Sequence, residues 1–466
     1  MNASGQTASP ARRVPETHPV RAPRRPLDVA GAPDRWALMA VCVVGAMIPW
    51  YTLRLFPLLT IGNATINLVD ALVGAAVLLA LPRIVDTVRR RTPAALWIAA
   101  FLLFMTVPFL MGMRDPDAAF YALREARGLA FYALALAFVA GGYRTDDYRA
   151  FAAAFVIGAT VAAAAVFAHV EGYLQIPGYP DELLKLQGWT GGVLLVKYLE
   201  WITPVVAFLL GLVGVLTARS RAVAVAWTLA SFILAWYILA TAERFIQGVA
   251  AFAAVLVVAV SGFRAIRIRP LAVVGAVCLI AAALALGSLT GGRWISRWAS
   301  FGAMRWGLIA SDGSLAFRLH EVTASLPLVV RNPVFGTGLG TRLPTGGPTP
   351  SEAQSAWHYV SAGYGYLLIR SGVTGLLLFL AMNAWALRVA WRHALKRPAG
   401  GEWPAATVGA MGLVTLLFAN LLHPVVDIPE GVIAFSLFFG MIASADDGRV
   451  VDATRSVPAA SGRSMH

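Results

Sequence analysis

The feature that most constrains this chain is the repetition of long apolar runs. Runs of about 18 to 22 residues recur between residues 36 and 445, and each is long enough to cross the hydrocarbon of a bilayer as a helix. Helices are expected because lipid offers backbone groups no hydrogen-bond partners. The composition agrees, with 58% hydrophobic and 13% charged residues. We therefore predict an all-α polytopic membrane protein.

The apolar runs predict about twelve transmembrane helices. We expect them near residues 36–53, 66–81, 94–113, 118–139, 151–169, 198–216, 222–241, 246–262, 270–288, 361–387, 405–422 and 431–445. The runs show no internal repeat.

These spans divide the chain into five parts. We expect a basic cytoplasmic tail at 1–34, nine helices within 35–288, a large extracytoplasmic loop at 289–360, three helices within 361–446, and a second tail at 447–466. The first part is polar, rich in Pro, Ala and Arg, and lacks the apolar core of a signal peptide, so it is predicted to be disordered. Both cysteines stand in apolar runs, so no disulfide is predicted.

We attribute the net charge of +14 to basic loops on the cytoplasmic side of the membrane and not to nucleic-acid binding. Short loops of membrane proteins carry Lys and Arg on the cytoplasmic side, and every short basic loop of this chain lands on one side if the N-terminus is inside. We predict a multi-pass protein of the bacterial inner membrane with both termini in the cytoplasm. Membrane lipids are then its surroundings, and no nucleic-acid partner is expected.

The 289–360 loop departs from that charge rule, because it is rich in arginine and tryptophan although it faces outward. Guanidinium groups bind phosphate oxygens bidentately, so an arginine-rich outer cavity suits a lipid-linked anion. Apolar spacing over 314–330 predicts an amphipathic helix at the interface. The glycine-rich stretch N-P-V-F-G-T-G-L-G that follows predicts a tight turn rather than a nucleotide loop.

Several arginines are candidates to bind such an anion, and each has a simpler alternative. Arg244, in T-A-E-R-F-I-Q-G, is either an interfacial anchor or a phosphate ligand. Arg318 either pairs with Glu321 along a helix or binds substrate. In A-L-R-E-A-R-G-L, Arg124 and Arg127 flank a single carboxylate, so one arginine needs a partner elsewhere unless both are interface anchors.

His358 is the candidate base, because a neutral imidazole at the outer mouth could take a proton from an attacking hydroxyl. The alternative is an interface histidine among Trp and Tyr. Asp427, in H-P-V-V-D-I-P-E-G, could orient that imidazole, pair with an arginine or cap a helix. No His/Cys cluster has metal-ligand spacing, and the first outer loop, 54–67, has no carboxylate, so neither a metal nor another cofactor is predicted.

In the order of these motifs the chain resembles the O-antigen ligase and polymerase superfamily of bacterial envelope glycosyltransferases. The motifs are A-L-R-E-A-R-G-L, T-A-E-R-F-I-Q-G, and F-R-L-H-E followed by N-P-V-F-G-T-G-L-G and W-H-Y with G-V-T-G-L-L-L-F. The resemblance covers about residues 36 to 445 and implies a GT-C-like membrane fold. Tyr359 stands where the family often has Asn, and Glu243 where it usually has Ser, which leaves the subfamily open.

The resemblance implies a metal-independent, inverting transfer of a glycan from undecaprenyl pyrophosphate. The donor's pyrophosphate would lie on Arg244 and Arg318, with Arg124, Arg127 and Arg342 as further candidates. His358 would be the base for the acceptor hydroxyl, supported by Asp427, at a periplasmic active site.

We expect an O-antigen ligase whose acceptor is lipid A-core. The alternatives are an O-antigen or exopolysaccharide polymerase, and a transporter of lipid-linked sugars. Transporters place polar groups at the bilayer midplane and use repeated halves, whereas here charge gathers at the outer rim.

Overall fold

The computed structural model describes part of the chain. The described residues are 33–47, 57–61, 64–170, 173–175, 202–240, 244–265, 323–343, 362–394, 404–421, 423–425 and 428–446.

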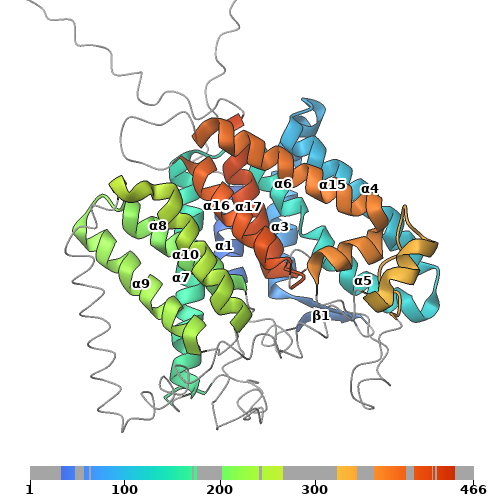
Figure 1. Cartoon of the computed structure of the whole chain (residues 1–466), viewed down its shortest axis with the longest axis horizontal. Coiled ribbons are helices and arrows are strands. Elements are labelled where there is room, and N and C mark those ends of the chain that lie inside the picture. Colours follow the sequence, from blue (N-terminus) through green and yellow to red (C-terminus); the bar gives the residue numbers. More distant parts are fainter. Residues whose placement is uncertain are drawn as a thin grey trace, which may run out of the picture.

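The described residues form a bundle of helices with one small β-hairpin (Figure 1). The helices are α1 (Pro33–Met47), α3 (Leu68–Arg89), α4 (Pro93–Met113), α5 (Pro116–Ala130), α6 (Ala133–Ala140), α7 (Thr145–Val170), α8 (Ile202–Thr217), α9 (Arg221–Ala240), α10 (Arg244–Ala265), α15 (Gly363–Ala394), α16 (Ala405–Ala419) and α17 (Pro429–Asp446). Strands β1 (Pro57–Ile61) and β2 (Ala64–Asn67) pair antiparallel, so the first predicted outer loop contains a hairpin that the all-α prediction did not include.

The protein is a helical, multi-pass membrane protein. Within the described residues, 6 helices are long and apolar enough to cross a bilayer, namely α3, α4, α7, α9, α15 and α17, and the apolar helices α8, α10 and α16 are shorter. The predicted span at 270–288 lies outside the described residues, as does most of the 289–360 loop. The total of twelve spans and the large outer loop therefore stay predictions.

The predicted span at 118–139 is wrong as a single helix, because the segment forms α5 and α6 with a break at Phe131 and Tyr132. The N–H groups of these two residues bond three residues back, to Gly128 and Leu129, which tightens the turn and ends α5. α5 is amphipathic, and its residues Glu125 and Arg127 have partners on neighbouring helices, as described below.

Helix α17 is the most enclosed of the candidate spans. In its apolar window 78% of residues are buried, against 22% in α9, and Figure 1 shows α17 in the middle of the bundle with α9 at the edge. α17 packs against α16, α6 and α15. The core of the protein therefore centres on α17, and α9 presents most of its surface outward.

A cluster of charged residues joins α1, α3 and α7 at one end of the bundle. The Asp34 carboxylate is 2% exposed and accepts hydrogen bonds from Arg83 Nη1 and the Tyr143 hydroxyl, each at 2.8 Å. Burial raises the pKa of Tyr143, so its hydroxyl keeps the proton that it donates. Beside it, Arg35 Nε lies 2.9 Å from Asp147 Oδ1. We call this the Asp34 end.

The opposite end of the bundle holds α5, the hairpin and the loop of residues 332–343, which we call the glycine loop. Asp70 in the first turn of α3 contacts α5, whereas Arg83 near the other end of α3 contacts Asp34. At 1.5 Å per residue these two side chains start about 20 Å apart along one helix. The glycine-loop end and the Asp34 end are thus opposite ends of the bundle, as the predicted alternation of spans requires.

Candidate functional site

The glycine loop has a backbone that only glycine adopts readily. Gly336, Gly338 and Gly340 have φ values of +72°, +89° and +72°. They face a second irregularity, Gly372 with φ +68°, which divides α15 into two helical parts. A Cβ on Gly336 would lie 2.5 Å from the Gly372 nitrogen, so the two glycines allow the loop and the helix to touch. The prediction of a tight turn here is confirmed.

The break in α15 supplies hydrogen bonds that hold the loop. A helix interrupted at Gly372 leaves the carbonyls before it without all their partners in the helix. The Thr337 N–H donates to the Ile369 carbonyl at 2.8 Å, and the Gly338 N–H donates to the Arg370 carbonyl at 3.2 Å. The loop therefore completes the hydrogen bonding of the broken helix and is fixed to it.

The other side of the glycine loop packs against α4 and α5. The Leu339 N–H donates to the Pro108 carbonyl of α4 at 2.9 Å. A Cβ on Gly112 would lie 2.0 Å from the Leu339 carbonyl oxygen, and one on Gly340 would lie 2.3 Å from the Ala122 nitrogen. Only residues without side chains permit this approach, so the glycines of the loop pack against three helices, α4, α5 and α15.

A buried ion pair lies where the loop, α5 and α15 meet. Glu125 Oε1 accepts from Arg370 Nη2 at 2.8 Å, while Oε2 accepts from the Gly340 N–H at 3.0 Å and the Tyr366 hydroxyl at 3.1 Å. Arg370 Nη1 donates to the Thr341 carbonyl. The Arg370 side chain is 0% exposed and that of Glu125 is 13% exposed. We call these five residues the Glu125 network.

The charge state of this pair follows from two opposing effects. Burial raises the pKa of the Glu125 carboxyl, since a charge is less stable away from water. The positive charge of Arg370 and the hydrogen bonds from Gly340, Tyr366 and Arg370 act in the opposite direction. Burial is the larger effect, so the pKa of Glu125 lies above its usual value, and its partners limit that rise.

Helix α5 carries a second ion pair. Arg127 donates from Nε and from Nη2 to the two carboxylate oxygens of Asp70, each at 2.5 Å, in the bidentate geometry that favours arginine. Asp70 also accepts from the Asn67 N–H at 2.7 Å, at the junction of the hairpin with α3. Arg127 thus has a carboxylate partner within the protein, and a contact between Arg127 and substrate stays a prediction.

Two predicted arginines at this end meet no carboxylate among the described residues. Arg124 on α5 and Arg342 in the glycine loop are both exposed. Glu125 on α5 pairs with Arg370, and Asp70 on α3 pairs with Arg127. The sequence analysis predicted that one arginine of A-L-R-E-A-R-G-L needs a partner elsewhere. Within the described part of the chain, the arginine that meets no carboxylate is Arg124.

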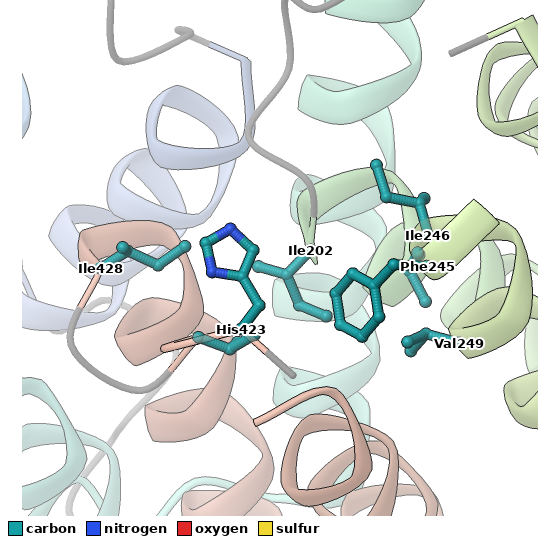
Figure 2. A pocket seen from close by; sticks show the side chains of 8 residues that line it. Ile202, Phe245, Ile246, Val249, His423 and Ile428 are labelled. Carbon is teal, nitrogen blue, oxygen red and sulfur yellow. The ribbon is translucent and has the colours of Figure 1, made fainter. Parts of the chain in front are cut away.

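The start of α10 forms a second region of interest. α10 begins at Arg244, whose side chain lies outside the described residues. The next residue, Phe245, has its ring 6.2 Å from the ring of His423, which follows α16 and is 9% exposed. Figure 2 shows His423 between Ile428 and Phe245, beside an otherwise apolar hollow that Ile202 also lines. The hollow holds little more than about one water molecule, so it is not itself a substrate pocket.

The first turn of α15 joins this second region to the Glu125 network. The Gly363 N–H donates to the Asn420 carbonyl at 3.1 Å, and the Tyr364 hydroxyl donates to the Leu417 carbonyl at 2.9 Å. A turn further on, Tyr366 contacts Glu125. The start of α15 is therefore hydrogen-bonded to both α16 and α5.

The predicted site residues divide into two groups. Arg124, Arg127 and Arg342 are described and lie on α5 or the glycine loop. His358, Arg318 and Asp427 lie outside the described residues, as does the side chain of Arg244, so the roles of these four residues stay predictions. Of the segment 314–330 that is predicted as an amphipathic helix, residues 323–330 are helical. Its amphipathic character and its place at the interface stay predictions, since Ser325 is buried while Leu326 and Val330 are exposed.

Sequence reasoning missed Arg370 and His423. Arg370 stands in the apolar run 361–387, and an ionisable residue within such a run is expected to have a partner inside the protein. That signal could have identified it. His423 stands in the same H-P-V-V-D-I-P-E-G motif as Asp427, but nothing in the spacing distinguishes it from an interface histidine.

Within the described ranges, no group of three or more His, Cys, Asp and Glu side chains is arranged to hold a metal ion. No family model matches the chain, and no curated protein matches it.

Proposed function

We propose that this protein is an O-antigen ligase of the bacterial inner membrane, which transfers a glycan from undecaprenyl pyrophosphate to lipid A-core oligosaccharide on the periplasmic face. The observation that carries the proposal is the pair of exposed cations at the glycine-loop end. Arg124 and Arg342 are the sequence neighbours of Glu125 and Thr341, two members of the Glu125 network, in which Glu125 is paired with Arg370. Such cations suit an anion delivered from the membrane, and arginine suits its phosphate oxygens.

The arrangement of the helix starts supports the same proposal. In the sequence, His358 precedes Gly363 closely, and Gly363 is bonded to the end of α16. Asp427 follows His423 closely, and His423 packs on the residue after Arg244. The predicted base, its supporting carboxylate and a predicted phosphate ligand therefore all flank described segments at one end of the bundle.

The proposed reaction is a displacement at the anomeric carbon of the donor's first sugar. The acceptor hydroxyl of lipid A-core attacks that carbon, and His358 takes the hydroxyl proton. The bond from the anomeric carbon to the phosphate oxygen breaks with inversion, and undecaprenyl pyrophosphate leaves with the bonding electrons. Arginine side chains at Arg244, Arg318, Arg124 and Arg342 stabilise the charge that grows on the leaving group, which accelerates the reaction itself.

The first test is transfer in vitro with purified protein and an undecaprenyl-pyrophosphate glycan. Two acceptors are offered, lipid A-core and a second copy of the donor. Product on lipid A-core alone is expected. Growth of the donor glycan would identify a polymerase instead, and the absence of either product from folded protein would favour a transporter.

The same assay tests the residues. His358→Ala is expected to lower transfer by about 10²–10⁴-fold, the usual contribution of a general base. Arg318→Lys is expected to weaken transfer because lysine cannot bind phosphate bidentately. Full activity of His358→Ala would remove the base assignment. Activity that is lost with a chelator and restored by a divalent ion would contradict the metal-independent mechanism.

A further inference from the structure

The buried pair Glu125–Arg370 has an energetic cost that stability alone does not justify. Arg370 lies in a candidate membrane span, and its side chain is 0% exposed. Taking two charges out of water costs so much that apolar residues in place of a buried ion pair are often as stabilising or more so. A role in positioning another part of the protein would account for the pair.

Both members of the pair bind the glycine loop just before Arg342. Glu125 Oε2 accepts from the N–H of Gly340, and Arg370 Nη1 donates to the carbonyl of Thr341. These groups belong to consecutive residues, so the pair fixes the direction of the backbone that leads into Arg342. Glu125 is also the neighbour of Arg124 in α5. A single ion pair thus relates the two exposed arginines to each other.

We infer that Glu125 and Arg370 are positioning residues, which hold Arg342 beside Arg124 so that both can bind one diphosphate group. The inference rests on the proposed function and extends it to residues that do not touch the substrate. A loop fixed in advance loses little conformational entropy when the anion binds, whereas a loose loop would have to be ordered at that step. The pair then raises affinity for the donor without contacting it.

The Asp34 cluster offers a matched control. Asp34, like Glu125, is a buried carboxylate that accepts from one arginine and one tyrosine. It lies at the other end of the bundle, and among its described partners there is no group of the glycine loop. Asp34→Asn therefore removes a comparable buried charge and leaves the loop alone.

The experiment compares Glu125→Gln, Arg370→Lys and Asp34→Asn with the unchanged protein in detergent. Gln replaces one acceptor oxygen with a donor, so it loses either Arg370 or the pair of donors on Oε2. Lys cannot reach Glu125 and Thr341 together as the guanidinium does. Two readouts are taken, namely amide hydrogen exchange of residues 332–343 and binding of undecaprenyl pyrophosphate.

We expect exchange in residues 332–343 to be about tenfold faster, and binding about tenfold weaker, in Glu125→Gln and Arg370→Lys, since a hydrogen bond to a charged group is worth about that factor or more. Asp34→Asn is expected to leave both readouts unchanged. Unchanged loop exchange in both test variants would overturn the inference, as would equal weakening of binding by Asp34→Asn.

The two readouts separate this inference from the proposed function. If the unchanged protein does not bind undecaprenyl pyrophosphate, the proposed function fails. The positioning role is then decided by exchange alone, where faster exchange confined to the two test variants supports it. Normal binding by both variants despite faster loop exchange would show that loop position does not matter to the donor and would overturn the inference.

Discussion

Asp34 and Glu125 are two buried carboxylates with nearly the same partners and different consequences. Each accepts from one arginine and one tyrosine, Arg83 and Tyr143 at one end and Arg370 and Tyr366 at the other. The first group joins the ends of helices to one another. The group around Glu125 also binds the glycine loop, because Glu125 accepts a hydrogen bond from the Gly340 N–H. Its sequence neighbours Arg124 and Arg342 are exposed. The same kind of contact therefore links helices around Asp34, whereas around Glu125 it also positions the glycine loop at the surface.

The largest difference between the two groups is expected when the arginine partner of each carboxylate is removed and the free energy of unfolding is measured. Arg370→Ala should lower the free energy of unfolding by about 3–5 kcal/mol, because it leaves the Glu125 carboxylate buried without a counter-charge. Arg83→Ala should cost less, about 1–2 kcal/mol. Asp34 is itself only 2% exposed, but the Arg83 side chain is 29% exposed, so water can enter the space that it leaves and solvate the carboxylate. Reversible unfolding in mixed detergent and SDS measures both. The double change Glu125→Met with Arg370→Met should recover most of the loss, and no recovery would mean that the loss did not come from the unpaired charge.

The fit between the glycine loop and the broken helix is the next feature to test. Gly336→Ala should cost about 1–3 kcal/mol, because φ at this position is +72° and the new Cβ would meet the Gly372 nitrogen. Gly74→Ala in α3 is the control, because nothing lies within 4 Å of a Cβ there, and it should be neutral or slightly stabilising. Thermal unfolding followed by circular dichroism compares them. Equal Tm values for the two variants would contradict the close contact.

The exposed arginines should affect binding and not stability. Arg124→Ala and Arg342→Ala are each expected to weaken binding of undecaprenyl pyrophosphate by about tenfold and to change unfolding by no more than about 0.5 kcal/mol. The loss should be smaller at high salt, because the interaction is electrostatic. Arg388→Ala, at an exposed position near the other end of α15, is the control and should bind normally. An equal loss in that variant would mean that net charge alone, rather than this surface, attracts the anion.

The smallest effect is expected from the two tyrosines. Tyr366→Phe and Tyr143→Phe each remove one hydroxyl donor to a buried carboxylate, and each should cost about 0.5–1.5 kcal/mol of stability. Only Tyr366→Phe should also speed exchange of residues 332–343, because only its carboxylate holds the loop. Exchange that is equally fast in both variants would mean that the two ends of the bundle do not act independently.

Signals within single segments were enough to predict the membrane class and most of the helices. Apolar runs near 94–113, 222–241 and 405–422 coincide with α4, α9 and α16, because length and hydrophobicity suffice to specify a helix in lipid. The glycines of the loop likewise predicted a turn, because a positive φ is readily adopted only by a residue without a side chain. Properties that belong to one segment can be inferred from that segment.

The pairing of the charged residues became visible only from the packing of the helices. The sequence shows Arg124, Glu125 and Arg127 within one helix, but it does not reveal that Glu125 belongs to Arg370 and Arg127 to Asp70. Those partners stand far away in the chain, and which of several arginines reaches a carboxylate depends on how the helices pack. The division of 118–139 into α5 and α6 was also missed, because the sequence over this range has no Pro or other clear helix breaker. Pairing is a property of distance in space, and a sequence records only order along the chain.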